Sequence, residues 1–153
     1  MSRQEPEHLR TGDRGESLAA WFLRLKGYRI LERNFECRCG EIDIVAWKKG
    51  TLVFVEVRTR KDGSLVAPLN SVTPVKAAKI IDTARWYLAG VARPLPPCRF
   101  DLVAVTPLGP RHQVNHIAGA FDTTTGEYVL GRRISAARSR RRFPPRRKRN
   151  TGK

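Results

Sequence analysis

Two short runs rich in β-branched and aromatic residues, separated by only four residues, constrain the fold of this chain more than any other feature. They are Glu41–Trp47 and Leu52–Arg58, joined by Lys48–Thr51, which contains a glycine. Runs of this composition favour β-strands, and so short a connection favours an antiparallel hairpin. The sequence therefore predicts a hairpin whose loop has either two residues, at Lys49-Gly50, or four.

This hairpin gathers four charged residues, because both loop lengths give the same pairing: Asp43 opposite Glu56, and Glu41 opposite Arg58. Side chains alternate along a strand, so these four share one face. The other face is predicted to be apolar and to consist of Ile42, Ile44, Ala46, Val53, Val55 and Val57. Opposed Cβ atoms lie about 5 Å apart, where two carboxylates destabilise a sheet unless a counter-charge neutralises them. A divalent cation is the natural candidate.

Positive charge is concentrated at the C-terminus. The 153 residues carry 30 Lys and Arg against 14 Asp and Glu, and residues 132–153 hold eleven of these bases and no acid. A block of like charge that includes Pro144-Pro145 cannot form a core, so we expect a disordered basic tail with a polyanionic partner. The phosphate-binding residues expected there are Arg138, Arg140, Arg141, Arg142, Arg146, Arg147, Lys148 and Arg149.

The remaining composition is typical of one cytoplasmic domain. With 41% hydrophobic residues, residues 11–131 are expected to form a single core, preceded by a flexible segment at residues 1–10. No run of about 18 apolar residues and no apolar signal core is present, so no membrane association is expected. Three cysteines without a two-residue zinc spacing are interpreted as reduced thiols. The alternative, a zinc site, would combine Cys37, Cys39 and Cys98 with one of His8, His112 or His116.

The rest of the pattern predicts an α/β fold. Asp13 and Glu16 resemble a capping box that opens a helix, and Gly27 ends it. The apolar stripe of this helix is predicted to be Leu18, Trp21, Phe22 and Leu25. A second helix follows Thr73-Pro74, with the stripe Ala77, Ile80, Ile81, Ala84 and Leu88.

Three further segments are predicted to be strands: Tyr28–Phe35, Arg99–Val105 and, more weakly, Gln113–Ala118; residues 62–71 are predicted to form a flexible loop. These elements give a mixed sheet in which an antiparallel three-strand meander is followed by a helix that crosses over to a strand parallel to the third.

Each candidate residue has a structural alternative. Asp43 and Glu56 lie inside apolar runs, where a half-buried carboxylate needs a partner. Glu41 and Arg58 form either a cross-strand ion pair or part of the site. Asp101 is either a bend or edge residue or a site residue. Structural roles also explain Glu16, as the cap partner, and His112 and His116, as surface residues.

Five motifs carry a resemblance to a known family. They are Gly15-Glu16, Gly40–Asp43, Phe54–Arg58, Val72–Lys76 and Cys98–Asp101. In this order they resemble the small bacterial YraN-like proteins, an endonuclease-like family, over about residues 11–121. The resemblance implies a restriction-endonuclease-like fold with a PD-(D/E)xK site. It assigns metal binding to Asp43 and Glu56, and it assigns to Glu16 the acidic position on the first helix.

The chain departs from this pattern at Arg58, where the nucleases have lysine. Lysine on a buried face can lose its proton, whereas arginine stays charged at any accessible pH, so Arg58 cannot be a general base. It can still orient water or stabilise charge on a phosphate. Lys76 is either a replacement for the missing amine or a solvent-exposed helix lysine.

The function expected from the sequence is phosphodiester hydrolysis by an endonuclease that uses Mg²⁺ or Mn²⁺, with DNA favoured over RNA as the partner. Asp43, Glu56, Arg58 and Glu16 are the expected catalytic residues, and Arg58 and Lys76 are expected to contact nucleic acid. A non-catalytic DNA- or RNA-binding protein on the same fold is the alternative, since phosphate neutralisation alone gives affinity. An RNA- or ribosome-associated factor would fit the tail, but no RNA-binding module is recognisable.

Overall fold

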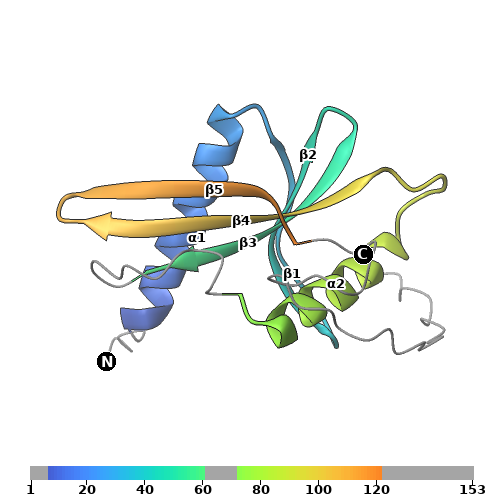
Figure 1. Ribbon diagram of the computed structural model, residues 1–153, viewed down its shortest axis with the longest axis horizontal. Helices are drawn as coiled ribbons and strands as arrows, with labels where there is room; N and C mark the ends of the chain where they lie inside the picture. Colours follow the sequence, from blue (N-terminus) through green and yellow to red (C-terminus); the bar gives the residue numbers. More distant parts are fainter. Residues whose placement is uncertain (1–6, 61–71, 122–153) are drawn as a thin grey trace, which may run out of the picture.

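A five-stranded mixed sheet with two helices forms the protein. The computed structural model describes residues 7–60 and 72–121. The elements are α1 (Glu7–Leu25), β1 (Arg29–Cys37), β2 (Gly40–Lys48), β3 (Thr51–Thr59), α2 (Pro74–Leu88), β4 (Cys98–Leu108) and β5 (Arg111–Phe121). The strand order is β1-β2-β3-β4-β5, with β3 and β4 parallel and every other pair antiparallel. The predicted meander and parallel crossover are therefore confirmed (Figure 1).

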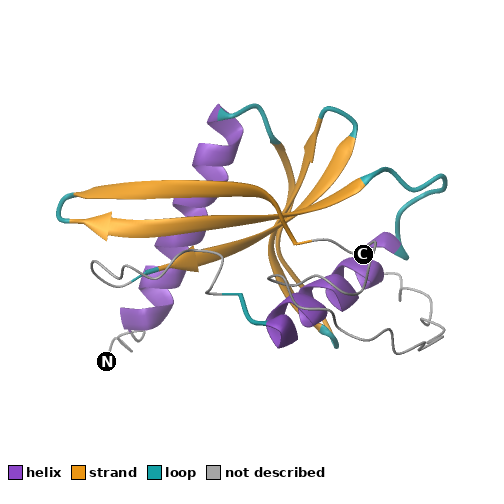
Figure 2. Cartoon of the chain, in the orientation of Figure 1, coloured by secondary structure: helices purple, strands orange, loops and turns teal. Residues whose placement is uncertain are grey.

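Each helix covers a different face of the sheet, so the core has two halves (Figure 2). The half under α1 consists of Ala19, Ala20, Leu23, Tyr28, Ile44, Ala46, Val53, Val55, Val103 and Val105. The half under α2 contains Ile42, Val45, Leu52, Phe54, Val72, Ala77, Ile80, Ala84, Phe100, Leu102 and Phe121. Strands buried on both faces are nearly continuously apolar. Any carboxylate inside β2 or β3 therefore requires an explanation.

The β2–β3 hairpin has the predicted register and the shorter of the two predicted loops. Lys48 pairs with Thr51, and the ladder continues to Ile44 opposite Val55. Lys49 and Gly50 have φ angles of 47° and 80°, as a two-residue type I′ turn requires. The turn thus fixes the alignment up to the Ile44–Val55 pair, and Asp43 and Glu56 are the next residues of the two strands, beyond the last pair of the ladder.

One predicted face assignment within the hairpin is wrong. Ile42 packs in the half of the core under α2, whereas its expected companions Ile44 and Val55 pack under α1. Alternation therefore fails at Asp43. The residues on either side of Asp43 pair with β1: Ile42 with Phe35, and Ile44 with Arg33. Between these two partners on β1 lies Asn34, which has a φ of 53°. The left-handed residue distorts the strand pair beside the candidate site.

The predicted start of the first helix is also wrong. α1 begins at Glu7, so Asp13 lies inside the helix and does not cap it. The buried face of α1 is formed by Ala19, Ala20 and Leu23, whereas Trp21 is 59% exposed. The predicted end is confirmed: Gly27 has a φ of 82°, and the N–H of Tyr28 donates to the carbonyl of Leu23, as in a Schellman motif.

The second helix matches its prediction. Thr73 caps α2, and its hydroxyl accepts a hydrogen bond from the N–H of Lys76, with Pro74 in the first turn. The cap and the proline together fix where the helix begins, and hence where Lys76 lies relative to β3.

Several predictions lie outside the described residues. They concern residues 1–6 of the N-terminal segment, the loop at 62–71, residues 122–131 and the basic tail at 132–153, and they remain predictions. Neither of the two described helices is long and apolar enough to cross a membrane.

Candidate functional site

α1 approaches β3 closely at Gly15, and this contact sets the position of the next residue, Glu16. Gly15 is buried, and a Cβ placed there would overlap Oγ1 of Thr59 and lie 3.1 Å from its Cβ. Only glycine permits this approach. Because Asp13 does not cap the helix, Glu16 has no capping role, and its Oε2 is buried without a hydrogen-bond partner.

We expect Gly15→Ala to lower the free energy of unfolding by about 1–3 kcal/mol, as overpacking typically does, and to displace Glu16. Gly12→Ala is the matched control, because nothing lies within 4 Å of a Cβ at that position of the same helix. Urea denaturation of both variants measures the difference. Thr59→Ala should recover part of the loss in Gly15→Ala by removing Oγ1. Equal stabilities of the two alanine variants would contradict the close contact.

Asp43 is held in place by the backbone of the neighbouring strand. Its Oδ2 accepts a hydrogen bond of 2.6 Å from the N–H of Val57, the residue after Glu56. Burial raises the pKa of Asp43 above its ordinary value, although the Val57 hydrogen bond and the charge of Lys76 oppose this. The hydrogen bond thus fixes the orientation of the Asp43 carboxylate, and the nearby positive charges do not fully offset the effect of burial on its pKa.

Glu56 is the most deeply buried carboxylate of the candidate site, with 3% of its side chain exposed. Its Oε1 lies 3.3 Å from Nζ of Lys76 and 3.3 Å from Nε of Arg58. Its Oε2 is buried without a hydrogen-bond partner. Burial, and next the negative charge of Asp43, raise the pKa of Glu56 to about 7, although Lys76 and Arg58 act in the opposite direction.

Burial is also the main reason why the pKa of Glu16 is raised, and the charge of Asp43 adds to the effect. Three carboxyl groups, Glu16, Asp43 and Glu56, thus bind protons more tightly than they would in water, for one shared physical reason. Carboxyl groups whose pKa values are shifted by burial and by neighbouring charges cluster at functional sites.

The cluster fits a divalent cation that keeps much of its water shell. The orphaned Oε2 atoms of Glu56 and Glu16 are hard oxygen donors, which Mg²⁺ prefers. Within residues 7–60 and 72–121, no three His, Cys, Asp or Glu side chains converge to enclose a metal ion. Asp43 and Glu56 therefore suit a site of one or two carboxylates supplemented by water, the common arrangement for Mg²⁺. The three cysteines, Cys37, Cys39 and Cys98, are free thiols, as predicted.

The two cations of the site differ from expectation. Arg58 makes its ion pair with Glu56, and among the described residues no salt bridge joins it to Glu41. Its Nε lacks a hydrogen-bond partner although it is buried, so it lies close to Glu56 without donating to it. Lys76 has a side chain only 28% exposed and reaches the same carboxylate from α2. The interpretation of Lys76 as a solvent-exposed helix lysine is wrong.

A second polar cluster was not anticipated. Asp101 is fully buried, and it accepts hydrogen bonds from both Nε and a terminal nitrogen of Arg99, at 2.7 and 2.8 Å, and from the N–H of Gly119. His116, expected at the surface, has only 3% of its side chain exposed, and its Nε2 lies 2.8 Å from Asp101. Burial raises the pKa of Asp101, but the hydrogen bonds from His116, Arg99 and Gly119 outweigh it, so the pKa is lowered.

The geometry of this second cluster indicates a structural role. Nδ1 of His116 lies 2.9 Å from Nζ of Lys26. Because an ammonium group only donates, Nδ1 accepts and Nε2–H donates to Asp101. Asp101 is therefore fully bonded, unlike Glu56. The sequence did contain a signal for this cluster: Asp101 is an isolated acidic residue in the predicted strand Arg99–Val105, and His116 lies in the strand that follows it.

The fold and the site define a mixed α/β protein in which a buried carboxylate, Glu56, contacts an arginine and a lysine, with the partly buried Asp43 on the neighbouring strand and Glu16 on the first helix. The chain belongs to the group described as "Uncharacterised protein family UPF0102", whose family model matches residues 15–105. This span includes all the residues of the site, and it confirms the YraN-like resemblance.

Relatives from several bacteria match over most of their own length. The UPF0102 protein of Pelobacter propionicus is 45% identical over 124 residues, which cover 79% of this chain and 89% of the relative. Those of Syntrophomonas wolfei and Geobacter metallireducens are 44% and 47% identical over 107 and 112 residues. These matches cover 70% and 72% of this chain, and 93% and 91% of the relatives.

The raised pKa of Glu56 predicts how stability depends on pH in the presence of a chelator. Between the ordinary pKa of 4.5 and the folded value of about 7, the folded protein binds more protons than the unfolded chain. Its stability therefore falls as the pH rises through this window, by up to roughly 3 kcal/mol. Thermal melts from pH 4.5 to 8 should show this fall, and Glu56→Gln should flatten it. A fall of equal size in Glu56→Gln would contradict the assignment.

Proposed function

We propose that the protein is a metal-dependent endonuclease that hydrolyses phosphodiester bonds in nucleic acid. The observation that carries this proposal is the environment of Glu56: one carboxylate oxygen contacts two cations, and the other is buried, orphaned and adjacent to Asp43. In the buried ion pair of Asp101, both carboxylate oxygens accept hydrogen bonds. Glu56 instead has one buried oxygen available for a cation and a strongly raised pKa, and such perturbed pKa values cluster at functional sites.

The order of the strands supports a restriction-endonuclease-like core. The meander β1-β2-β3 supplies Asp43 and Glu56 from adjacent antiparallel strands, and α2 then crosses to β4, which is parallel to β3. This arrangement is the one that the YraN-like resemblance implies, and Glu16 of the first helix lies close enough to Asp43 for the charge of Asp43 to raise its pKa.

In the proposed reaction, Mg²⁺ bound by Asp43 and Glu56 would supply activated water and neutralise the leaving oxygen. The residues of the chain provide direction and charge. The Val57 N–H fixes the Asp43 carboxylate, so one oxygen is committed and the other is available. Arg58 and Lys76 place two positive charges beside Glu56, where they can bind the phosphate on which negative charge develops.

We propose that Lys76 supplies the lysine amine that the PD-(D/E)xK pattern places on the strand corresponding to β3. The pattern places that lysine two residues after the glutamate, where this chain has Arg58. The α2 ammonium reaches Oε1 of Glu56 at the same distance as Arg58 does. The amine thus arrives from a different element at the same carboxylate, so the arginine at position 58 does not deprive the centre of a lysine.

The test of this function is cleavage of a panel of end-labelled substrates: duplex, single-stranded and branched DNA, and RNA. We expect cleavage with Mg²⁺ or Mn²⁺ and none with chelator, and we expect Asp43→Asn to abolish it. Asp82→Asn, which removes an exposed carboxylate on α2, is the matched control and should cleave normally. Absence of metal-dependent cleavage on every substrate would overturn the proposal.

A non-catalytic nucleic-acid-binding protein is the second candidate, and Arg58 is the observation that favours it. Arginine at this position retains phosphate affinity without a base. Residues 132–153 would add sequence-independent affinity in either case. Salt-dependent binding of duplex DNA without cleavage would select this candidate.

A further inference from the structure

A pocket of about 320 Å³ lies between the β1–β2 hairpin and α2, directly beside the candidate site. It is lined by Glu36, Cys37, Gly40, Glu41, Lys76, Lys79 and Ile80. Lys76 belongs both to this pocket and to the ion pair with Glu56. Whatever occupies the pocket therefore adjoins the proposed catalytic centre.

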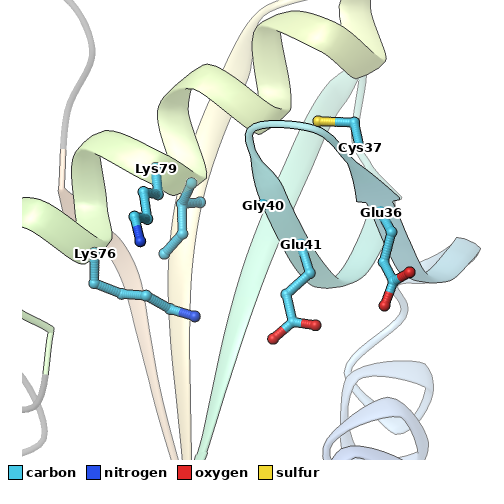
Figure 3. A pocket seen from close by; sticks show the side chains of 7 residues that line it. Glu36, Cys37, Gly40, Glu41, Lys76 and Lys79 are labelled. Carbon is cyan, nitrogen blue, oxygen red and sulfur yellow. The ribbon is translucent and has the colours of Figure 1, made fainter.

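The two walls of the pocket carry opposite charge. Figure 3 shows Lys76 and Lys79 extending from α2, and the carboxylates of Glu36 and Glu41 on the hairpin side. A ligand with a phosphate at one end and hydrogen-bond donors at the other would complement both walls. A continuous phosphate backbone would not, because the acidic wall repels it.

Glu36 and Glu41 are also directly paired across β1 and β2. Opposed like charges destabilise a strand pair, and no salt bridge within the described part of the chain neutralises either of them. Carboxylates in such a pair favour a ligand that donates hydrogen bonds to both. Amino groups of nucleobases are donors of this kind, and carboxylates accept from them in base recognition.

The hairpin turn closes the pocket toward the C-terminal half of α2. A Cβ placed at Gly40, whose φ is 148°, would lie 3.2 Å from Oγ1 of Thr83. In the same turn between β1 and β2, the guanidinium of Arg38 lies 4.9 Å from the centre of the Trp86 ring. The hairpin therefore rests directly on the helix, and the pocket ends there. A volume near the lower end of the usual range of roughly 300–1,000 Å³ suits one small ligand and no double helix.

We propose that this pocket binds a single unpaired nucleotide next to the scissile phosphate, with its phosphate at Lys79 and its base amino group at Glu36 and Glu41. The inference rests on the proposed function for the position of the cleaved bond. It predicts that substrates with an unpaired nucleotide at the cleavage site are preferred over continuous duplex. It also predicts that bases with an amino group, such as cytosine, are preferred over thymine.

Binding of free mononucleotides tests the pocket without any catalytic step. The full-length protein in chelator is titrated with dCMP and with dTMP, and binding is followed by NMR chemical shifts. We expect dCMP to bind more tightly than dTMP. Lys79→Met should weaken both nucleotides about tenfold or more, and Lys79→Arg should restore much of the affinity. Glu36→Gln should remove the preference for dCMP. Lys49→Met is the matched control, since it removes an exposed lysine at the β2–β3 turn.

Cleavage assays then separate this inference from the proposed function. The substrates are one duplex and the same duplex with a short unpaired stretch, compared as kcat/KM. Mononucleotide binding that depends on Lys79 and Glu36, without cleavage of any substrate, would support the pocket and overturn the nuclease. Cleavage of both substrates at equal rates, with dCMP binding unaffected by Lys79→Met and Glu36→Gln, would overturn the pocket and leave the nuclease in place.

Discussion

Glu56→Gln and Asp43→Asn are each expected to weaken Mn²⁺ binding strongly and to reduce metal-dependent cleavage to background. Both substitutions keep the size of the side chain and remove its negative charge. The neutral amide cannot balance a divalent cation in this buried setting, where Oε2 of Glu56 has no hydrogen-bond partner among the residues that the structure describes. Titration with Mn²⁺, followed by calorimetry, measures the binding directly.

Thermal melts give a second measure of the same site. A cation that binds only the folded protein stabilises it by about 2.7 kcal/mol at a concentration of a hundred times its Kd. We expect Mn²⁺ to raise the melting temperature of the wild-type protein and of Asp82→Asn, and to leave those of the two site variants unchanged. Mn²⁺ affinity equal to wild type in both Asp43→Asn and Glu56→Gln would end the assignment of a metal site.

Lys76→Met is expected to lower the single-turnover rate of cleavage by about a hundredfold or more, the usual cost of losing a donor that stabilises the transition state. Arg58→Ala should cause a similar loss, whereas Arg58→Lys should retain measurable cleavage because it keeps the charge without the planar fork. The double variant Arg58→Lys, Lys76→Met places the amine where the nuclease pattern has it. This double variant should recover part of the activity that Lys76→Met loses.

A pH profile distinguishes this role of Lys76 from a purely structural one. The positive charge of Lys76 lowers the pKa of Glu56, so its removal should raise that pKa and shift the rise in activity to higher pH. Lys49→Met serves as the control for loss of a lysine. Wild-type rates and an unchanged profile in Lys76→Met would exclude Lys76 from the mechanism, and wild-type rates in Arg58→Ala would exclude Arg58.

Local chemistry made part of this fold predictable. The β2–β3 hairpin followed from a glycine turn between two apolar runs, and the start of α2 followed from Thr73-Pro74. Both signals act over a few residues, so the sequence alone displays them. The register from Lys48–Thr51 to Ile44–Val55 follows from the glycine turn, whereas the predicted pairing of Asp43 with Glu56 lies beyond the last pair of the ladder.

Other features depended on contacts between distant parts of the chain. Asp13 had the chemistry of a cap, but α1 begins at Glu7, so Asp13 lies inside the helix. The ion pair of Lys76 with Glu56 could not be predicted from the sequence, because it depends on how α2 packs on the sheet after the crossover and on which side of α2 faces β3. His116 was misplaced because its contacts come from distant parts of the chain, from Phe22 of α1 and Asp101 of β4.

The parallel pairing of β3 with β4 has a consequence for synthesis of the chain. Parallel strands need a long crossover before they can meet, so β3 lacks one neighbour until residues 98–108 are available. Asp43 and Glu56 lie in an early hairpin, but Lys76 reaches Glu56 only after α2 has formed, and β4 then pairs with β3 beside Glu56. A nascent polypeptide on the ribosome, surrounded by RNA, therefore emerges with both acidic residues in place before the proposed centre is assembled.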